Sequence, residues 1–90
     1  MGKRVHIIIR GRVQGVGFRF FVRDRARQLT LSGWVRNRAD GGVEVVAEGE
    51  DRCLQQLVAL CNNGPFGAIV RDMTVEWQES SGEFPNFVIR

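Results

Sequence analysis

The sequence has little of what common hydrolase sites are built from. It contains one histidine, two cysteines and two prolines among 90 residues. His6 lies inside an apolar run, where we expect a structural role, and no serine, cysteine or carboxylate accompanies it in a nucleophile arrangement. The pattern argues against a serine or cysteine hydrolase.

The two cysteines are not spaced for a disulfide or a zinc site. Cys53 and Cys61 fall in one expected helix, where their separation corresponds to an axial rise of about 12 Å. A disulfide needs Cα atoms within about 7 Å of each other. The clustered spacing of zinc ligands is also absent. We expect two structural thiols and no bound metal.

No apolar run is long enough for a signal peptide or a membrane span. A myristoylation motif would need Ser or Thr where His6 stands. Hydrophobic residues make up 43% and charged residues 26% of the chain, which is ordinary for a soluble globular protein. We therefore expect a single domain over residues 1–90, located in the cytoplasm and not bound to a membrane.

Lysine is nearly absent, whereas arginine is abundant. The net charge is +3, and all but one of the thirteen Lys and Arg residues are arginine. The planar guanidinium suits phosphate and carboxylate groups. This composition favours an anionic ligand, but a nucleic acid, a small phosphorylated substrate and a solvated basic face remain open.

Apolar periodicity predicts two helices and five strands. Alternation predicts strands, and the sequence ADGG predicts a tight hairpin turn between two of them. Apolar residues at helical spacing predict helices, the first with a basic outer face. Strands are expected at residues 5–10, 31–37, 41–49, 68–78 and 84–90, and helices at 18–29 and 50–64.

This order predicts an α+β fold, the ferredoxin-like split βαβ sandwich. The elements run β-α-β-β-α-β with a short C-terminal edge strand, forming an antiparallel sheet with both helices on one face. Right-handed crossovers make the first two strands parallel and allow the third to lie between them. The glycine-rich stretch after the first strand and residues 36–38 after the second then leave the sheet at the same edge.

The stretch RGRVQGVGFRF, residues 10–20, is the first candidate site. A glycine-rich turn that opens onto a helix leaves backbone N–H groups unpaired at the positive end of the helix dipole, which forms an anion site. Arg19 lies in the first helical turn and can fold over the same cavity. The alternative is a sharp turn only, and the third glycine of a dinucleotide motif is missing at Phe20.

Asn37 is the second candidate, because its carboxamide ends a strand beside two arginines and offers both a donor and an acceptor. The alternative is that it simply begins the turn NRADGG. For other acidic residues and for the two tryptophans we expect structural positions and no role in a site. Solvated positions are expected for Glu44, Glu48, Glu50 and Asp51, and core positions for Trp34 and Trp77.

Several blocks in order resemble the acylphosphatase family across essentially the whole chain. They are GRVQGVGFR, A..L, GWVRNRADGGVEVVAEG, L..L, GP and F.IR. The resemblance implies an enzyme that hydrolyses the carboxyl-phosphate anhydride of acyl phosphates without metal or cofactor. It implies that Arg19 binds the phosphoryl group and that Asn37 orients the attacking water. The implied substrate-binding residues are Gln14, Gly15, Val16, Gly17, Phe18 and Arg19.

The sequence departs from the usual family pattern at Val22, often Thr, and at Thr30, often Gly. These changes affect hydrogen bonding along the first helix and the shape of its exit turn. The chain length argues against the related domain at the start of large carbamoyl-transfer maturation proteins. The family implies a small-molecule substrate, inorganic phosphate as product and competitive inhibitor, and a monomer.

Two alternatives come from other functional classes. GVGFRFFV loosely resembles the aromatic signature of RNA-recognition domains, but that signature belongs on the third strand, whereas here it spans a loop and a helix. We therefore expect no nucleic-acid partner. An inactive anion-sensing domain would bind phosphate without turnover.

Overall fold

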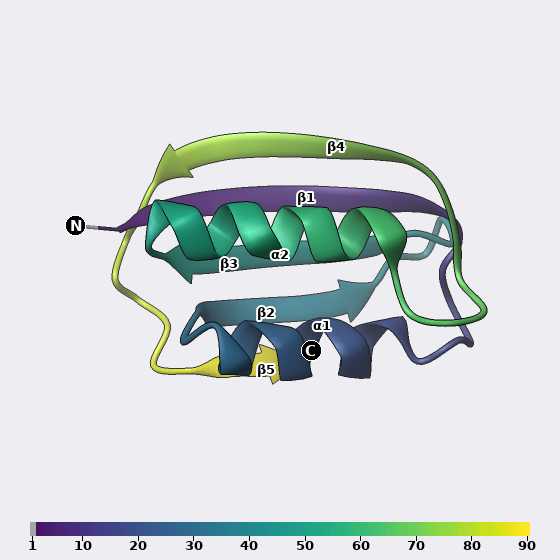
Figure 1. Ribbon diagram of the computed structural model, residues 1–90, viewed down its shortest axis with the longest axis horizontal. Coiled ribbons are helices and arrows are strands. Elements are labelled where there is room, and N and C mark those ends of the chain that lie inside the picture. Colours follow the sequence, from purple (N-terminus) through teal and green to yellow (C-terminus); the bar gives the residue numbers. More distant parts are fainter. Residues whose placement is uncertain (1) are drawn as a thin grey trace.

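The computed structural model describes residues 2–90 of the chain. These residues form the predicted β-α-β-β-α-β order followed by a short last strand (Figure 1). The elements are β1 (Lys3–Arg12), α1 (Phe18–Gln28), β2 (Ser32–Asn37), β3 (Val43–Gly49), α2 (Asp51–Asn63), β4 (Ile69–Glu79) and β5 (Phe87–Ile89).

The strands form one sheet in the order β4-β1-β3-β2-β5. β3 pairs antiparallel with both β1 and β2, so β1 and β2 are parallel with β3 between them, as predicted. The sheet is mixed rather than wholly antiparallel, because β5 pairs parallel with β2. β4 ends at the end of the sheet where β2 begins, so the chain reaches the free edge of β2 in the same direction as β2 (Figure 1).

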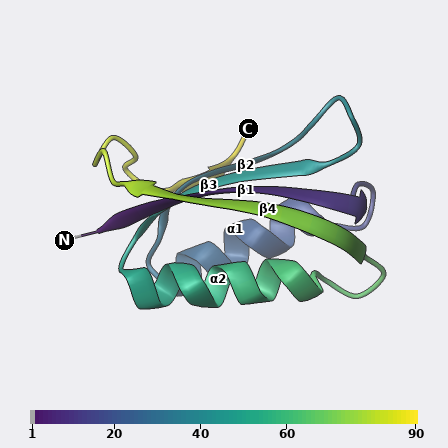
Figure 2. The same ribbon diagram turned by 90° about the horizontal axis from the view of Figure 1, so that it is seen from above.

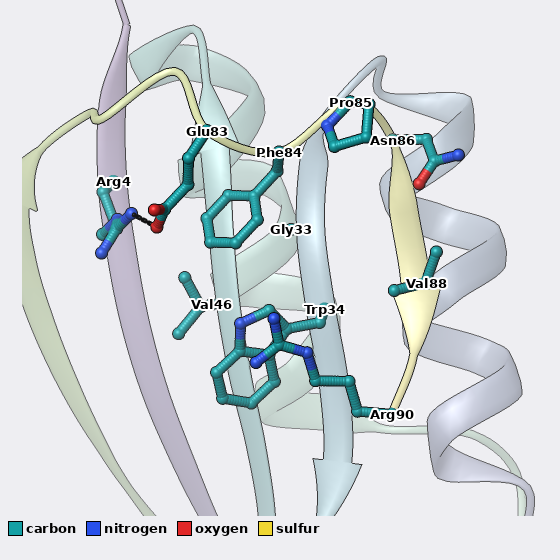
Figure 3. Close-up of a pocket in the computed structure, with 10 residues that line it drawn as sticks. All are labelled: Arg4, Gly33, Trp34, Val46, Glu83, Phe84, Pro85, Asn86, Val88 and Arg90. Carbon is teal, nitrogen blue, oxygen red and sulfur yellow. Dashed lines mark hydrogen bonds and ion pairs between the residues drawn. The ribbon is translucent and has the colours of Figure 1, made fainter.

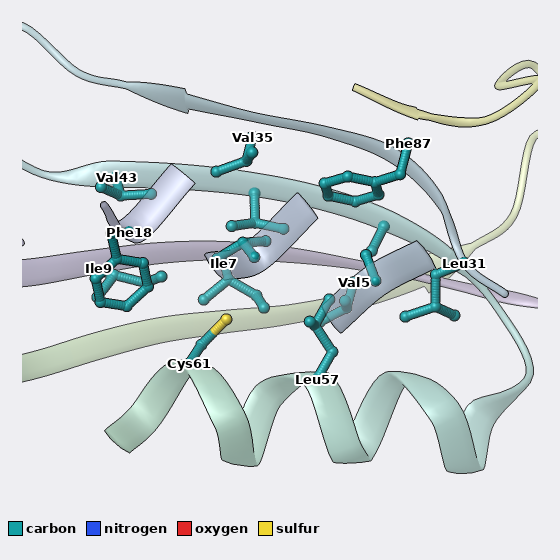
Figure 4. Close-up of a cluster of buried hydrophobic side chains, with 14 of the residues drawn as sticks. Val5, Ile7, Ile9, Phe18, Leu31, Val35, Val43, Leu57, Cys61 and Phe87 are labelled. Carbon is teal, nitrogen blue, oxygen red and sulfur yellow. The ribbon is translucent and has the colours of Figure 1, made fainter. Parts of the chain in front are cut away.

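Both helices cover one face of the sheet, as predicted (Figure 2). Val5, Ile7 and Ile9 of β1 alternate with more exposed neighbours and are fully buried beneath the helices. Figure 4 shows this core between the sheet and α2. The helices add to it the buried residues Phe18, Val22, Ala26, Leu54, Leu57 and Cys61.

Both cysteines are free thiols, as expected from their spacing. Cys61 lies in the core, and burial raises the pKa of its thiol to about 12. Cys53 is half-buried against the edge of the core. The two side chains therefore serve packing.

The two departures from the family pattern lie within α1 and just after it. Val22 is fully buried on the core-facing side of the helix. Thr30 adopts φ 58, a left-handed conformation that costs a threonine about 1 kcal/mol relative to glycine. The helix still ends in a regular turn, because the Leu31 N–H donates to the Ala26 carbonyl at 2.9 Å. The exit turn is thus closed by backbone hydrogen bonds with a threonine in the left-handed position.

The open face of the sheet carries two buried carboxylates where solvated ones were expected. Glu44 is 8% and Glu48 is 4% exposed. Glu44 lies 2.6 Å from His6 Nε2 and accepts a hydrogen bond from Arg36 Nε at 2.8 Å. The pairing gives His6 the expected structural role. Alternation placed both glutamates on the outer face, but it could not show which residues from other strands cover them.

The Glu48 carboxylate holds residues 81–82 against the sheet by hydrogen bonds. It accepts hydrogen bonds from Arg4 Nε at 2.7 Å and from the Ser81 and Gly82 backbone N–H groups, both at 2.9 Å. Burial alone would raise the pKa of the Glu48 carboxyl, but these donors outweigh it and lower that pKa to about 2. The loop before β5 is therefore anchored by a charge that persists at neutral pH.

We expect acid to weaken this anchor. The folded-state pKa of Glu48 lies below the ordinary value of 4.5, so its stabilisation is complete above pH 4.5 and is lost as pH falls toward 2. The contribution is at most about 3 kcal/mol. Urea unfolding of the wild type and of Glu48→Gln at pH 6 and pH 2.5 checks this. The stability difference between the two proteins should shrink in acid, and a constant difference would contradict the role of the charge.

The two tryptophans do not occupy the helix-covered core. Trp34 is buried, but it lies on the open face, with Arg90 4.7 Å and Arg36 5.2 Å from its ring. Trp77 is 45% exposed on the edge strand β4, so the core prediction was wrong for it. An edge strand has a neighbour on one side only, which leaves a large side chain there partly uncovered.

A pocket of about 580 Å³ opens beside Trp34 on this face. Figure 3 shows Phe84, Val46 and Trp34 around it, with Arg4 and Arg90 on opposite sides. Neither the glycine-rich stretch nor Asn37 lines this pocket. This pocket and the predicted site are therefore in different places.

Candidate functional site

The glycine loop, residues 13–17, joins β1 to α1 through two left-handed glycines. Gly15 has φ 75 and Gly17, which caps α1, has φ 77. A Cβ added at either position would meet no atom within 4 Å, so the backbone conformation, and not close packing, requires glycine here. Such a sequence of backbone angles turns consecutive N–H groups toward one side of the loop.

These N–H groups are available to a ligand. Within the described residues, the N–H groups of residues 15–19 donate to no backbone or side-chain acceptor, and the first turn of α1 has neither an acidic residue nor a side-chain cap. The first backbone hydrogen bond of the helix runs from the Phe21 N–H to the Gly17 carbonyl at 3.0 Å. The positive end of α1 and these unpaired donors therefore form a place suited to an anion.

Two side chains of this segment hold it against the core. Phe18 is 2% exposed, and its ring meets that of Phe21 edge-on with 6.0 Å between centroids. Val16 is half-buried against the same cluster. Both side chains are apolar, so these residues could bind an anion only through their backbone N–H groups.

Arg19 supplies a cation with no competing partner. It is the second residue of α1 and is half-buried. No carboxylate of residues 2–90 forms an ion pair with it, whereas Arg23, one turn further along, lies 3.0 Å from Asp24. Its guanidinium is free to close over the N–H groups at the start of the helix.

Asn37 is the last residue of β2 and lies at the same end of the sheet. It pairs with Val43 of β3, which pairs with Ile9 of β1, so the three residues form a row across the sheet. Strand alternation puts Asn37 on the helix-covered face together with Val35. It also lines an open pocket of about 420 Å³ with its neighbours in residues 36–40.

Gln14 connects the glycine loop to the segment that follows Asn37. Its Nε2 donates to the Arg38 carbonyl at 2.8 Å and to the Gly42 carbonyl at 2.9 Å. The side chain of Gln14 is thus a brace between two loops, in addition to the substrate-binding role that the family resemblance implies for this residue. No local pattern reveals this contact, because its partners lie 24 and 28 residues away.

The hairpin after Asn37 is a loop of residues 38–42, longer than the tight turn that was predicted. Its geometry is fixed by a hydrogen bond from the Arg38 N–H to the Gly42 carbonyl at 2.8 Å. Hydrogen bonds from the Arg38 side chain and the Gly42 N–H lower the pKa of the Asp40 carboxyl. Arg38 is therefore neutralised by Asp40, as Arg36 is by Glu44. Arg19, in contrast, forms no ion pair with any carboxylate of residues 2–90.

Figures 1 and 2 place the glycine loop and the β2–β3 loop at one end of the molecule. The structure thus places the segments that carry the predicted site residues, 14–19 and Asn37, at the same end of the molecule. Among residues 2–90, no group of three or more His, Cys, Asp or Glu side chains could hold a metal ion. Neither helix of the described chain has the length and apolar character needed to cross a bilayer.

Comparison with known proteins gives a consistent family. The acylphosphatase family model matches residues 5–89. An acylphosphatase from Pelotomaculum thermopropionicum is 48% identical over 86 residues, covering 96% of this chain and 94% of the relative. The crystal structure of acylphosphatase from Bacillus subtilis superposes with a TM-score of 0.94 at 43% identity, covering 98% of both chains. An acylphosphatase structure from Coxiella burnetii gives a TM-score of 0.88 at 38% identity, covering 99% and 93%.

Proposed function

The chain belongs to the acylphosphatase family and is a hydrolase of acyl phosphates, and we propose that the glycine loop, Arg19 and Asn37 carry its reaction. One observation supports this assignment most. The unpaired N–H groups of residues 15–19 and the unpaired Arg19 lie beside the strand end that carries Asn37, and Gln14 ties the two segments together.

In this proposal the substrate's phosphoryl group lies in the glycine loop. Its oxygens accept hydrogen bonds from the backbone N–H groups, and Arg19 grips two of them with its planar guanidinium. Phosphoryl transfer spreads negative charge over three equatorial oxygens, so fixed donors around that group stabilise the transition state. The loop supplies these donors without rearranging, because its glycines already hold the required backbone angles.

Asn37 then holds a water molecule in line with the phosphorus. The water oxygen forms a bond to phosphorus while the bond from phosphorus to the acyl oxygen breaks, and the carboxylate leaves with that electron pair. The water proton passes to an oxygen of the phosphate, which gives inorganic phosphate. A carboxylate is a stable leaving group, so this step requires no separate general acid.

We further propose that the protein acts as a monomer, needs no metal or cofactor, and is inhibited competitively by inorganic phosphate. A cytoplasmic location is proposed because reducing conditions suit the free thiols Cys53 and Cys61. The RNA-binding alternative is not favoured, because the aromatic residues Phe18, Phe20 and Phe21 lie on α1 and not on a central strand.

Hydrolysis of benzoyl phosphate, followed by ultraviolet absorbance, tests the proposed function. Turnover should continue in excess EDTA and should be inhibited competitively by inorganic phosphate. Loss of turnover in EDTA that added metal restores would defeat the metal-free mechanism. Phosphate binding by calorimetry without any turnover would instead identify an anion-sensing domain.

A further inference from the structure

The loop between α2 and β4, residues 64–68, carries the most exposed large apolar side chain among residues 2–90. Phe66 has a relative exposure of 104%, compared with 54% for Phe20 and 45% for Trp77. The Ala68 N–H donates to the Pro65 carbonyl at 3.1 Å, which sets Phe66 and Gly67 at the tip of a turn. A fully exposed phenyl ring presented on a defined turn has apolar surface available for a ligand.

This turn is fixed against the start of α1. A Cβ added to Gly64 would lie 2.8 Å from Phe18 Cε2, so the backbone of the turn packs directly on the first residue of that helix. The first residue of β4, Ile69, pairs with Arg12 at the end of β1. The chain on both sides of Phe66 is therefore anchored beside the segment that contains the glycine loop.

The glycine loop lies between two other loops. Figure 2 shows the β2–β3 loop on one side of it and the α2–β4 loop on the other, and Figure 1 shows all three at the same end of the molecule. Gln14 bonds the glycine loop to the β2–β3 loop, and Phe18 contacts the α2–β4 loop. A phosphoryl group held in the glycine loop would thus lie between the loop that follows Asn37 and the loop that carries Phe66.

In-line transfer decides which way the acyl group points. The attacking water and the leaving oxygen lie on opposite sides of phosphorus. With the water held by Asn37, the acyl group points away from β2 and toward the α2–β4 loop. We propose that Phe66 contacts the acyl group and makes the enzyme selective for acyl phosphates with an apolar or aromatic acyl group. This inference rests on the proposed function of the glycine loop and Asn37.

The chemistry of the loop agrees with such a substrate. Residues 62–70, NNGPFGAIV, contain no charged side chain. The last turn of α2 has no basic residue either. An acyl group with a second carboxylate would find no cation on this loop, whereas a phenyl or branched alkyl group would cover the Phe66 ring and displace water from it.

The test compares kcat/KM for benzoyl phosphate with kcat/KM for acetyl phosphate in the same protein. Phe66→Ala should lower the benzoyl-to-acetyl ratio about five- to tenfold, because the methyl group of acetyl phosphate gains little from the ring. Phe66→Leu should keep part of the ratio. Trp77→Ala removes an exposed aromatic from the edge strand at the other end of the sheet and should leave the ratio at its wild-type value.

The possible outcomes distinguish a failure of the proposed function from a failure of the proposed role of Phe66. If the wild type hydrolyses neither substrate, the proposed function fails and the role of Phe66 fails with it. If the wild type hydrolyses both and Phe66→Ala keeps the wild-type ratio, the role of Phe66 is overturned and the proposed function stands. An equal loss in Trp77→Ala would also overturn it, since the effect would then not depend on position. Circular dichroism confirms that each variant is folded.

Discussion

Arg19→Ala is expected to lower kcat/KM for benzoyl phosphate about a thousandfold, in the range found for arginines that stabilise a transferring phosphoryl group. The size of the effect follows from the charges around the site. Arg36 is paired with Glu44 and Arg38 with Asp40, so neither can replace the lost guanidinium. In the proposed mechanism Arg19 holds the phosphoryl group in the bound substrate and holds it more strongly in the transition state, so kcat should fall and the inhibition constant for inorganic phosphate should rise.

Two further variants test whether the loss in Arg19→Ala comes from the missing guanidinium. Arg23→Ala removes an arginine from the same helix that is already paired with Asp24, and it should keep near-native turnover. Arg19→Lys keeps the charge but loses the two-pronged donor, so it should recover only part of the activity. Near-native turnover in folded Arg19→Ala would place the anion site elsewhere.

Asn37→Ala is expected to lower kcat about a hundredfold, equivalent to about 3 kcal/mol, by analogy with the removal of one preorganised donor. In the proposed mechanism the Asn37 amide aims the water and does not hold the phosphate, so the loss should fall on kcat. KM for benzoyl phosphate and the inhibition constant for phosphate should therefore change little. Steady-state kinetics on the folded variant, with added phosphate, measure all three quantities.

Asn62→Ala provides the matched control, since it removes an exposed asparagine amide near the end of α2. It should behave as the wild type. A rise in KM for Asn37→Ala with kcat unchanged would mean that Asn37 binds substrate. The water would then be positioned by another group.

Much of the fold could be predicted from local patterns. Val5, Ile7 and Ile9 alternate along a strand, and Phe18, Val22 and Ala26 recur along a helix, so both faces could be assigned before any contact was known. The turn chemistry of the glycine loop likewise needs only neighbouring residues. These features depend on backbone geometry within one helix, strand or turn, so the residues of that segment are enough to predict them.

The features that escaped prediction depend on residues distant in sequence. Glu48 is buried because residues 81–82 fold over it, and no pattern within β3 indicates that cover. β5 is parallel to β2 because of where β4 happens to end. At the candidate site, the grouping of Arg19 with Asn37 could be predicted from topology, whereas the Gln14 brace and the pairing of Arg36 and Arg38 could not.

The hydrogen bonds of the Gln14 side chain help to explain how a small protein can hold its proposed catalytic groups in place. The Gln14 amide, on the glycine loop, donates to two main-chain carbonyls of the β2–β3 loop. Both loops are connected to strands of the same sheet. The distance between the glycine loop and the strand end that carries Asn37 is therefore set by the sheet and by these two hydrogen bonds. A substrate would therefore meet a binding loop and a water-holding amide whose backbones are already joined before it arrives.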